Sequence, residues 1–417
     1  MKSSPKSIKS PLRFGRYDYA SFFSFFSYAS GSVVIPVALV ALANELGFPL
    51  QKGGLAAGGA LHLARTIPMV AAMLLCGFMA GRWGKRKSFG FSVLLMALGV
   101  FLCAISPSYS ILFLGLMIAG CGEGVIEGLA TPFIHDLHLK EEPGRYINFT
   151  HSFWSVGVLV TVLVSGALLS VDISWRYLIG GVSVLGLISA CLILFPAKKG
   201  HEFPENTEPI HWTQTRNNTT KIITIPKFWL FFLAMFFAGG GEFCLTFWCA
   251  SYIQLSFGAS AWAGGVGTAC FAGGMVLGRM GCGILIKQHH FRRLLMVSSL
   301  AGAFVSLSLP FVQNLWLFFV LLFLVGVASA PYWPSIQSYC SDKMPEVDST
   351  MLLILLSCAG VPGCGFFTWL MGIIGNITGD LRIAFYLVPI CYFILATLII
   401  YEWWHEKTGL RLSDTKQ

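Results

Sequence analysis

Twelve long apolar segments dominate this sequence of 417 residues, and each could cross a lipid bilayer as a helix. A transmembrane helix needs about 20 mostly apolar residues, because its backbone polar groups must pair with one another inside the hydrocarbon core. Only 11% of the residues are charged, against roughly 25% in a typical soluble chain. We therefore expect an all-α membrane protein with spans at about 17–44, 53–81, 88–106, 109–136, 145–171, 174–196, 227–256, 261–286, 292–311, 314–340, 348–376 and 381–404.

One polar stretch divides these spans into two sets of six. Residues 197–226 are rich in charged and amide side chains, and they separate the sixth span from the seventh. The sequence thus predicts an N-terminal six-helix half at 1–196, a cytoplasmic linker at 197–226 and a C-terminal six-helix half at 227–417.

The distribution of lysine and arginine predicts that both termini are cytoplasmic. Basic residues are enriched in cytoplasmic loops, and most of those outside the spans lie in the two tails, the linker and the loops on that side. The opposite side holds Lys52, Arg176 and Arg382. The net charge of +9 therefore indicates topology and contact with anionic lipid, not nucleic-acid binding. We expect a multi-pass cell-membrane protein, located in the inner membrane if the source is a bacterium.

Two sequence echoes relate the halves. Residues Gly77–Gly84 and Gly274–Gly281 both follow the pattern G-x-x-x-G-R-x-G, and basic residues follow each. Trp175–Tyr177 before the sixth span is echoed by Leu381–Ile383 before the twelfth. Echoes in matching places indicate a duplicated, pseudo-symmetric bundle. Paired repeats with a binding site at their interface are the usual build of secondary transporters.

The first of these motifs resembles the loop 2–3 signature of the major facilitator superfamily, G-x-x-x-D-R-x-G-R-R/K. Gly81 stands where the family usually has Asp, so the latch of the outward-facing state is expected to be weaker or differently built. The resemblance implies alternating access and a cytoplasmic gate, to which we also assign Arg279 of the second motif. The matching residues are Gly77, Arg82, Gly84, Lys85 and Arg86.

Two further segments resemble the fucose permease-like branch, the fucose–galactose–glucose:proton symporters. That branch often has E/D-x-x-x-N in span four, where this chain has Glu127 and Thr131. Fucose permease also carries an acid four residues before a proline in span one, where this chain has Ser32 before Pro36. The branch opens span five with L-N-x-x-H-x-x-x-x-x-G, and the matching residues are Asn148, His151 and Gly157. The resemblance implies proton-coupled transport of a sugar.

Few ionisable residues fall inside the spans, and the cost of placing them there makes each a candidate for a site. Glu123 and Glu127 lie four residues apart on one helical face, which predicts a coupled pair that accepts protons. A structural pair satisfied by Arg65 or by hydroxyl groups is the alternative. His62 and Arg65 share a face of span two. Arg65 either neutralises an acid of span four or grips an anionic substrate.

The other predicted substrate-binding residues lie in spans five, seven and ten. Glu242 follows three glycines, which would let span seven bend beside a cavity. Pro331 and Pro334 are expected to break span ten around two aromatic residues, whose faces suit a sugar. Residues 135–138 read His-Asp-Leu-His, and a solvated helix end is expected there instead of a metal site. The substrate-binding candidates outside span two are His151, Glu242, Trp248, Tyr332, Trp333 and Gln337.

These observations predict a secondary active transporter that moves a small polar solute, a sugar or sugar-like compound, by proton symport. The alternative is a proton-coupled exporter or antiporter of amphipathic compounds or organic anions. The sequence contains no G-x-x-x-x-G-K-S/T phosphate loop, so an ion or solute gradient must supply the energy. Nothing predicts an enzyme, a metal or a cofactor. The expected partners are the solute, protons and lipid, and a monomer suffices for the mechanism.

Overall fold

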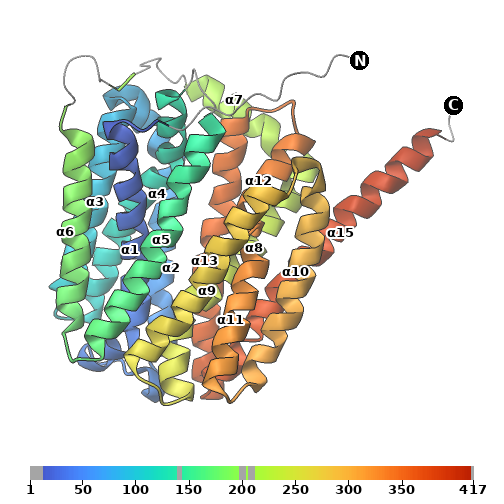
Figure 1. Ribbon diagram of the computed structural model, residues 1–417. Helices are drawn as coiled ribbons and strands as arrows, with labels where there is room; N and C mark the ends of the chain where they lie inside the picture. Colours follow the sequence, from blue (N-terminus) through green and yellow to red (C-terminus); the bar gives the residue numbers. More distant parts are fainter. Residues whose placement is uncertain (1–12, 139–142, 197–202, 205–211, 415–417) are drawn as a thin grey trace.

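The computed structural model describes residues 13–138, 143–196, 203–204 and 212–414 (Figure 1). All regular structure in this part of the chain is helical, and twelve of its helical segments are long and apolar enough to cross a membrane. The helices of the first half are α1 (Arg16–Glu45), α2 (Leu55–Trp83), α3 (Lys85–Ala104), α4 (Tyr109–Leu137), α5 (Pro143–Leu169) and α6 (Trp175–Leu194).

The second half begins after α7 (Trp212–Ile223), a helix between the two sets of spans. Its helices are α8 (Pro226–Ser256), α9 (Ala261–Leu285), α10 (Phe291–Ser308), α11 (Leu315–Ser329), α12 (Tyr332–Lys343), α13 (Ser349–Thr378), α14 (Leu381–Ala384) and α15 (Leu387–Asp414). Short 3₁₀ turns lie at Leu50–Lys52, Gln288–His290 and Leu309–Phe311.

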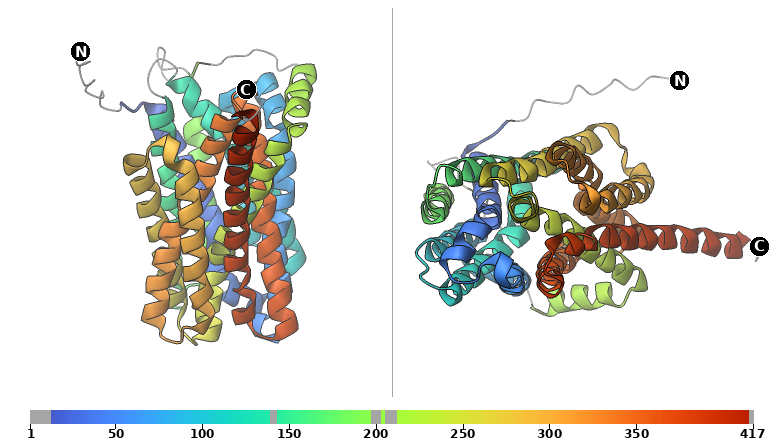
Figure 2. Two further views of the ribbon diagram at one scale, coloured as in Figure 1. Left: turned by 90° about the vertical axis from the view of Figure 1, so that its right-hand side faces the viewer. Right: turned by 90° about the horizontal axis from the view of Figure 1, so that it is seen from below.

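The prediction of twelve spans is confirmed, with three local differences. Helix α7 lies within the stretch that hydropathy marks only as a linker. The twelfth span is divided into α14 and α15, and α15 continues to Asp414, beyond the predicted end at 404 (Figures 1 and 2). The tenth span is divided as expected, because Pro331 cannot donate a backbone hydrogen bond to the turn before it. The segment therefore forms α11 and α12.

Equivalent helices pair in the same way in both halves. In the first half α1 packs on α5, α2 on α4 and α3 on α6. The corresponding pairs of the second half are α8 with α13, α9 with α11 and α10 with α15. The view from below shows the two groups of helices side by side (Figure 2). This recurrence is the structural counterpart of the two sequence echoes.

Two helix pairs, α2 with α13 and α5 with α9, make the main contacts between the halves. Small residues let these backbones approach closely, as is typical of helices packed in membranes. A Cβ atom at Gly59 of α2 would lie 2.8 Å from the carbonyl oxygen of Thr368 in α13. A Cβ atom at Gly265 of α9 would lie 2.5 Å from the carbonyl oxygen of Val162 in α5. The halves are thus in direct backbone contact on both sides of the bundle.

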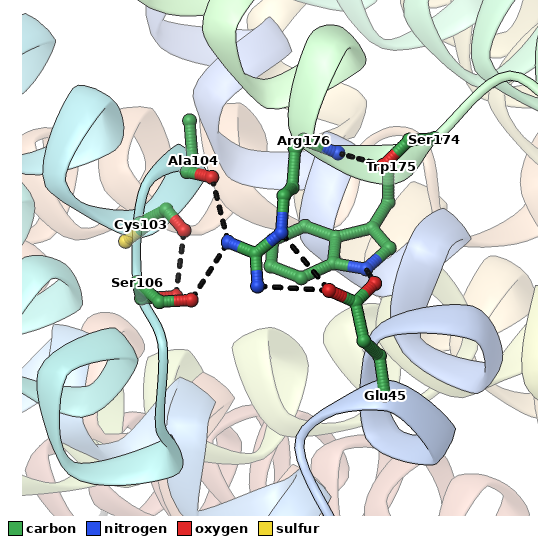
Figure 3. A network of polar contacts seen from close by, with 7 residues as sticks. All are labelled: Glu45, Cys103, Ala104, Ser106, Ser174, Trp175 and Arg176. Carbon is green, nitrogen blue, oxygen red and sulfur yellow. Dashed lines mark hydrogen bonds and ion pairs between the residues drawn. The ribbon is translucent and has the colours of Figure 1, made fainter.

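Arg176 ties three helices together at the C-terminal end of α1 (Figure 3). Its guanidinium donates at 3.0 Å to the carbonyl oxygen of Ala104, the last residue of α3, and at 2.7 Å to that of Ser106 just after it. It also pairs with Glu45 of α1 at 2.9 Å, and the indole of Trp175 donates to the same carboxylate at 2.6 Å. The network joins the ends of α1, α3 and α6.

Candidate functional site

The first polar centre joins α2 and α4 through Arg65 and Glu123. Two glycines of α4, Gly120 and Gly124, lie against the backbone of α2, so Glu123 between them is pressed against Arg65. The Nε atom of Arg65 donates to Oε2 of Glu123, and the two side chains are only 6% and 1% exposed. The guanidinium also donates to the hydroxyl of Ser32, and to its carbonyl oxygen at 3.2 Å.

This geometry bears on two expectations. Arg65 faces the acid of span four, which is the first of the two arrangements considered for it. Ser32, which stands where fucose permease has an acid, provides neutral oxygen atoms to the same guanidinium. The other carboxylate oxygen of Glu123, Oε1, is buried and has no hydrogen-bond partner among the described residues. A Cβ atom at Gly31 of α1 would lie 3.8 Å from it, so this oxygen faces α1.

His62 lies one turn before Arg65 and reaches across to the second half. Its Nδ1 atom lies 2.8 Å from the hydroxyl of Thr368 in α13. The imidazole stacks on Phe243 and Phe247 of α8, with centroids 5.3 and 5.2 Å away. Trp248 is fully buried beside them, and its indole donates to the carbonyl oxygen of Thr368 at 2.8 Å. His62 and Trp248 therefore meet at one residue of α13.

The second polar centre joins α8 and α9 through Glu242 and Arg279, at a distance of 3.3 Å. Arg279 also donates to the carbonyl oxygen of Ala330 at 3.2 Å and to the hydroxyl of Ser155 at 3.5 Å. Its guanidinium lies 5.8 Å from the ring centre of Trp154. Because Trp154 and Ser155 belong to α5, Arg279 contacts both halves. Its expected place in the cytoplasmic gate stays a prediction.

The three glycines before Glu242 do not interrupt the helix, since α8 is continuous from Pro226 to Ser256. They make room for neighbouring helices instead. A Cβ atom at Gly239 would lie 2.6 Å from the carbonyl oxygen of Gly360 in α13. One at Gly241 would meet the ring of Tyr392 in α15. The helix is therefore not interrupted at these glycines, which serve close packing.

Glu127 is half-buried and points toward different neighbours from Glu123. The groups that act on its carboxyl electrostatically are Tyr28 of α1 and Arg279 of α9. One turn further along α4, the hydroxyl of Thr131 lies 3.0 Å from Nε2 of His151 in α5. No ion pair joins Glu127 to another described residue, whereas Glu123 holds an arginine. The two acids thus occupy distinct environments, although they share a helix.

The aromatic candidates of span ten are packed against neighbouring helices. Tyr332 is fully buried, and its hydroxyl donates to the carbonyl oxygen of Ser298 in α10 at 2.8 Å. The amide of Gln337 donates to the hydroxyl of Ser357 in α13 at 3.2 Å. Trp333 is half-buried against α13. Of the three, Trp333 and Gln337 keep partial exposure, so they remain the better candidates for contact with a solute.

Two small cavities lie beside the polar centres. Each has a volume of about 10 Å³, which is room for about one water molecule. One is lined by residues of α1, α2, α4 and α8, among them Ser32, His62 and Arg65. The other lies between α5, α8 and α9 and is lined by Trp154 and Ser155 among others. The candidate site therefore spans both halves.

The predicted gate residues lie at the ends of α2 and α3. Gly84 joins the two helices with a φ of 83°, a conformation that favours glycine. Lys85 pairs with Asp136 of α4 at 2.5 Å. Arg86 donates to the carbonyl oxygens of Ile193 and Leu194 in α6, at 3.1 and 2.7 Å. Arg82 is exposed, and Gly77 lies within α2. These contacts join helices of the first half.

The solvated helix end expected at residues 135–138 is wrong for two of its residues. Asp136 and His138 are 8% and 7% exposed. Asp136 is covered by Lys85, and Nε2 of His138 lies 2.7 Å from Asp18 of α1. Among the described residues no group of His, Cys, Asp and Glu could hold a metal ion. Sequence periodicity could not show that α1 and α3 cover this end of α4.

A further ionic cluster at the same end of the second half was not predicted. Glu406 of α15 pairs with Lys343 at 2.5 Å and with Arg292 at 3.0 Å. Glu402, one turn earlier, accepts a hydrogen bond from the hydroxyl of Tyr339 at 2.6 Å. The spacing of these two acids, four residues apart on one helical face, was the available signal, but the span was predicted to end at 404.

The arrangement described so far defines a class of protein: two pseudo-symmetric six-helix groups with buried polar centres between them, as in secondary transporters. The chain belongs to the Major Facilitator Superfamily, whose family model matches residues 20–289 and 232–413. It is accordingly a multi-pass membrane transporter of small molecules, and this family does not consist of enzymes.

Individual relatives agree with this assignment. The tetracycline resistance protein of class H from Pasteurella multocida is 23% identical over 325 residues, which is 75% of this chain and 77% of that protein. Three curated glucose or niacin transporters align over only 22%, 25% and 27% of their own length.

Two solved structures share the fold over nearly the whole chain. A D-xylose–proton symporter superposes with a TM-score of 0.76 and 13% identity, covering 92% of this chain and 96% of that one. A variant of the E. coli fucose:proton symporter gives a TM-score of 0.63 and 17% identity, covering 92% and 98%.

Proposed function

We propose that this transporter is a proton-coupled symporter of a small, uncharged polar solute, a sugar or sugar-like compound, and that Glu127 is its proton site. The observation that carries the proposal is that three intramembrane acids differ in their ion pairing. Glu123 and Glu242 each pair with an arginine, so protonating either would leave that arginine without its carboxylate partner. Glu127 makes no ion pair with another described residue, so protonating it breaks no such pair.

The charges of the site favour an uncharged solute. Arg65 is balanced by Glu123, and Arg279 by Glu242. A protonated Glu127 then leaves the centre neutral, while Trp333 and Gln337 offer an aromatic face and an amide. The engagement of Arg65 disfavours the organic-anion alternative, because no cation is left over to bind the anion there.

The energetics are sufficient for accumulation. One proton that crosses 100 mV releases about 2.3 kcal/mol. At about 1.4 kcal/mol for each tenfold change, this supports a roughly 50-fold gradient of a neutral solute. The solved sugar–proton symporters support the proposal only through their shared fold.

The test compares uptake and exchange in proteoliposomes. A panel of radiolabelled monosaccharides, including D-xylose and L-fucose, is offered with and without an inward proton gradient. For any sugar that wild type accumulates, Glu127→Gln is expected to abolish gradient-driven uptake and to retain counterflow exchange. Glu45→Gln, at the end of α1 and remote from the site, is the matched control and is expected to accumulate the sugar. Undiminished gradient-driven uptake by Glu127→Gln would contradict the assignment.

A second candidate function has one observation in its favour, the similarity to the tetracycline resistance protein over three quarters of the chain. It is a proton-coupled exporter of amphipathic compounds. In that case a thermal-shift panel would show stabilisation by amphipathic cations and not by sugars. Substrate movement would also be driven by a proton gradient of the opposite direction.

A further inference from the structure

Arg279 is the charged side chain of the site that reaches from one half to the other. It extends from α9 to the hydroxyl of Ser155 in α5, at 3.5 Å, and lies over the ring of Trp154. In its own half it contacts Glu242 at 3.3 Å and the carbonyl oxygen of Ala330 at 3.2 Å. A change in its position therefore changes the contact between the halves.

These bonds are long for an arginine. Charge-assisted N–H···O bonds are usually 2.7–2.9 Å, and each contact of Arg279 exceeds 3.1 Å. The Arg279 side chain is 26% exposed, compared with 6% for Arg65, whose guanidinium is held by both Glu123 and Ser32. Arg65 is thus firmly fixed, whereas Arg279 is held loosely enough to change partner.

The alternative partner is Glu127, and helix geometry places it near Ser155. Helices α4 and α5 are consecutive and antiparallel, and they are linked by the contact of Thr131 with His151 at 3.0 Å. Residues four apart lie on the same helical face. One turn from this contact, in the direction away from the chain connection, α4 carries Glu127 and α5 carries Ser155. The charge of Arg279 acts on both Glu127 and His151.

We propose that Arg279 is the positioning residue that couples the proton on Glu127 to the contact between the halves. With Glu127 protonated, Arg279 stays on Glu242 and Ser155, as in this structure. When Glu127 loses its proton, the new carboxylate draws the guanidinium toward α4 and away from Glu242. The contact of α9 with α5 and α8 then loosens. This inference rests on the proposed role of Glu127 as the proton site.

The test is a double-mutant cycle that needs no substrate. Hydrogen–deuterium exchange is measured by mass spectrometry on purified wild type, Glu127→Gln, Arg279→Gln and the double variant, at a pH where wild-type Glu127 is ionised. Glu127→Gln is expected to slow amide exchange severalfold in peptides of α5 and α9, because it fixes Arg279 on Glu242. In the Arg279→Gln background the same substitution is expected to change nothing. Arg279→Lys is expected to restore part of the effect.

A matched cycle controls for general destabilisation. Glu123→Gln removes an acid of the same helix that pairs with Arg65 instead of Arg279. Its effect on amide exchange is expected to be the same in the presence and absence of Arg279. An equal effect of Glu127→Gln in both backgrounds would overturn the proposal, because energetically independent sites are additive.

A second variant keeps the test decisive if Arg279→Gln does not fold. Glu242→Gln leaves Arg279 in place but removes its competing partner, so it is expected to speed exchange in α5 and α9. In this background Glu127 is the remaining carboxylate partner of Arg279, so adding Glu127→Gln is expected to speed exchange further, opposite to its effect in wild type. No effect, or an effect of the same sign as in wild type, would overturn the proposal. The two hypotheses fail separately. If Glu127→Gln loses proton-driven uptake but its effect on exchange is additive with that of Arg279→Gln, only the role of Arg279 is refuted. If Glu127→Gln retains proton-driven uptake, the assignment of the proton site is refuted.

Discussion

Removing Arg65 is expected to destabilise the protein strongly, and the structure sets the size of the effect. Its side chain and that of Glu123 are 6% and 1% exposed, so the pair lies in the regime of fully buried ion pairs. Breaking such a pair from one side costs about 3–5 kcal/mol, since an uncompensated charge remains in the interior. Arg65→Gln also weakens the bonds to Ser32. We expect Arg65→Gln to lower the free energy of unfolding by an amount within that range.

The double variant isolates the contribution of the pair. In the double variant Arg65→Gln/Glu123→Gln, no unpaired charge remains in the interior. Its loss of unfolding free energy is expected to be at least about 2 kcal/mol smaller than that of Arg65→Gln alone. The comparison pair is Arg176 with Glu45, whose side chains are 31% and 47% exposed. Because solvent screens it, the corresponding coupling energy is expected to be about 1 kcal/mol or less.

The assay is reversible unfolding in mixed micelles by SDS titration, followed by far-UV circular dichroism, on the members of both cycles. The reasoning would be refuted if Arg65→Gln destabilised no more than Arg176→Gln. It would also be refuted if the double variant were as unstable as Arg65→Gln, because neutralising Glu123 would then have relieved nothing.

Three further substitutions test the packing by the same unfolding assay. Gly59→Ala is expected to cost about 1–3 kcal/mol, because its Cβ atom would meet the backbone of α13; Gly181→Ala, with nothing within 4 Å, is expected to cost nothing. Lys85→Ala is expected to cost about 1–3 kcal/mol by uncovering buried Asp136, and adding Asp136→Asn should recover most of the loss. Trp248→Phe is expected to cost about 1 kcal/mol through its lost bond to α13; no loss would show that this bond contributes nothing.

The transmembrane architecture was largely predictable because its causes are local. Hydropathy and length specify each span, and the break around Pro331 follows from the missing backbone donor of proline. The helix α7 escaped prediction because its sequence, Trp212–Ile223, is polar, and hydropathy marks such a stretch only as a linker. The continuation of α15 to Asp414 was missed for the same reason.

The pairing of the intramembrane charges was only partly predictable. Arg65 and an acid of span four were natural partners, because few charges exist there. The contact of Arg279 with Glu242 depends on how α9 packs on α8, and the sequence repeat drew attention to the cytoplasmic gate instead. The burial of Asp136 likewise depends on α3, which supplies Lys85 from a distant part of the chain. The residues that share one face of a helix can be predicted from the local sequence, but the helix that packs against that face cannot.

The central claim, that Glu127 carries the coupled proton, is tested most directly by measuring proton and sugar movement together. Proteoliposomes containing a pH-sensitive dye are given an outside-to-inside gradient of a sugar that wild type transports, with no proton gradient imposed. Wild type is expected to acidify the interior as the sugar enters. Glu127→Gln is expected to carry sugar in counterflow and to leave the internal pH unchanged. Sugar-dependent acidification by Glu127→Gln at the wild-type rate would contradict the account.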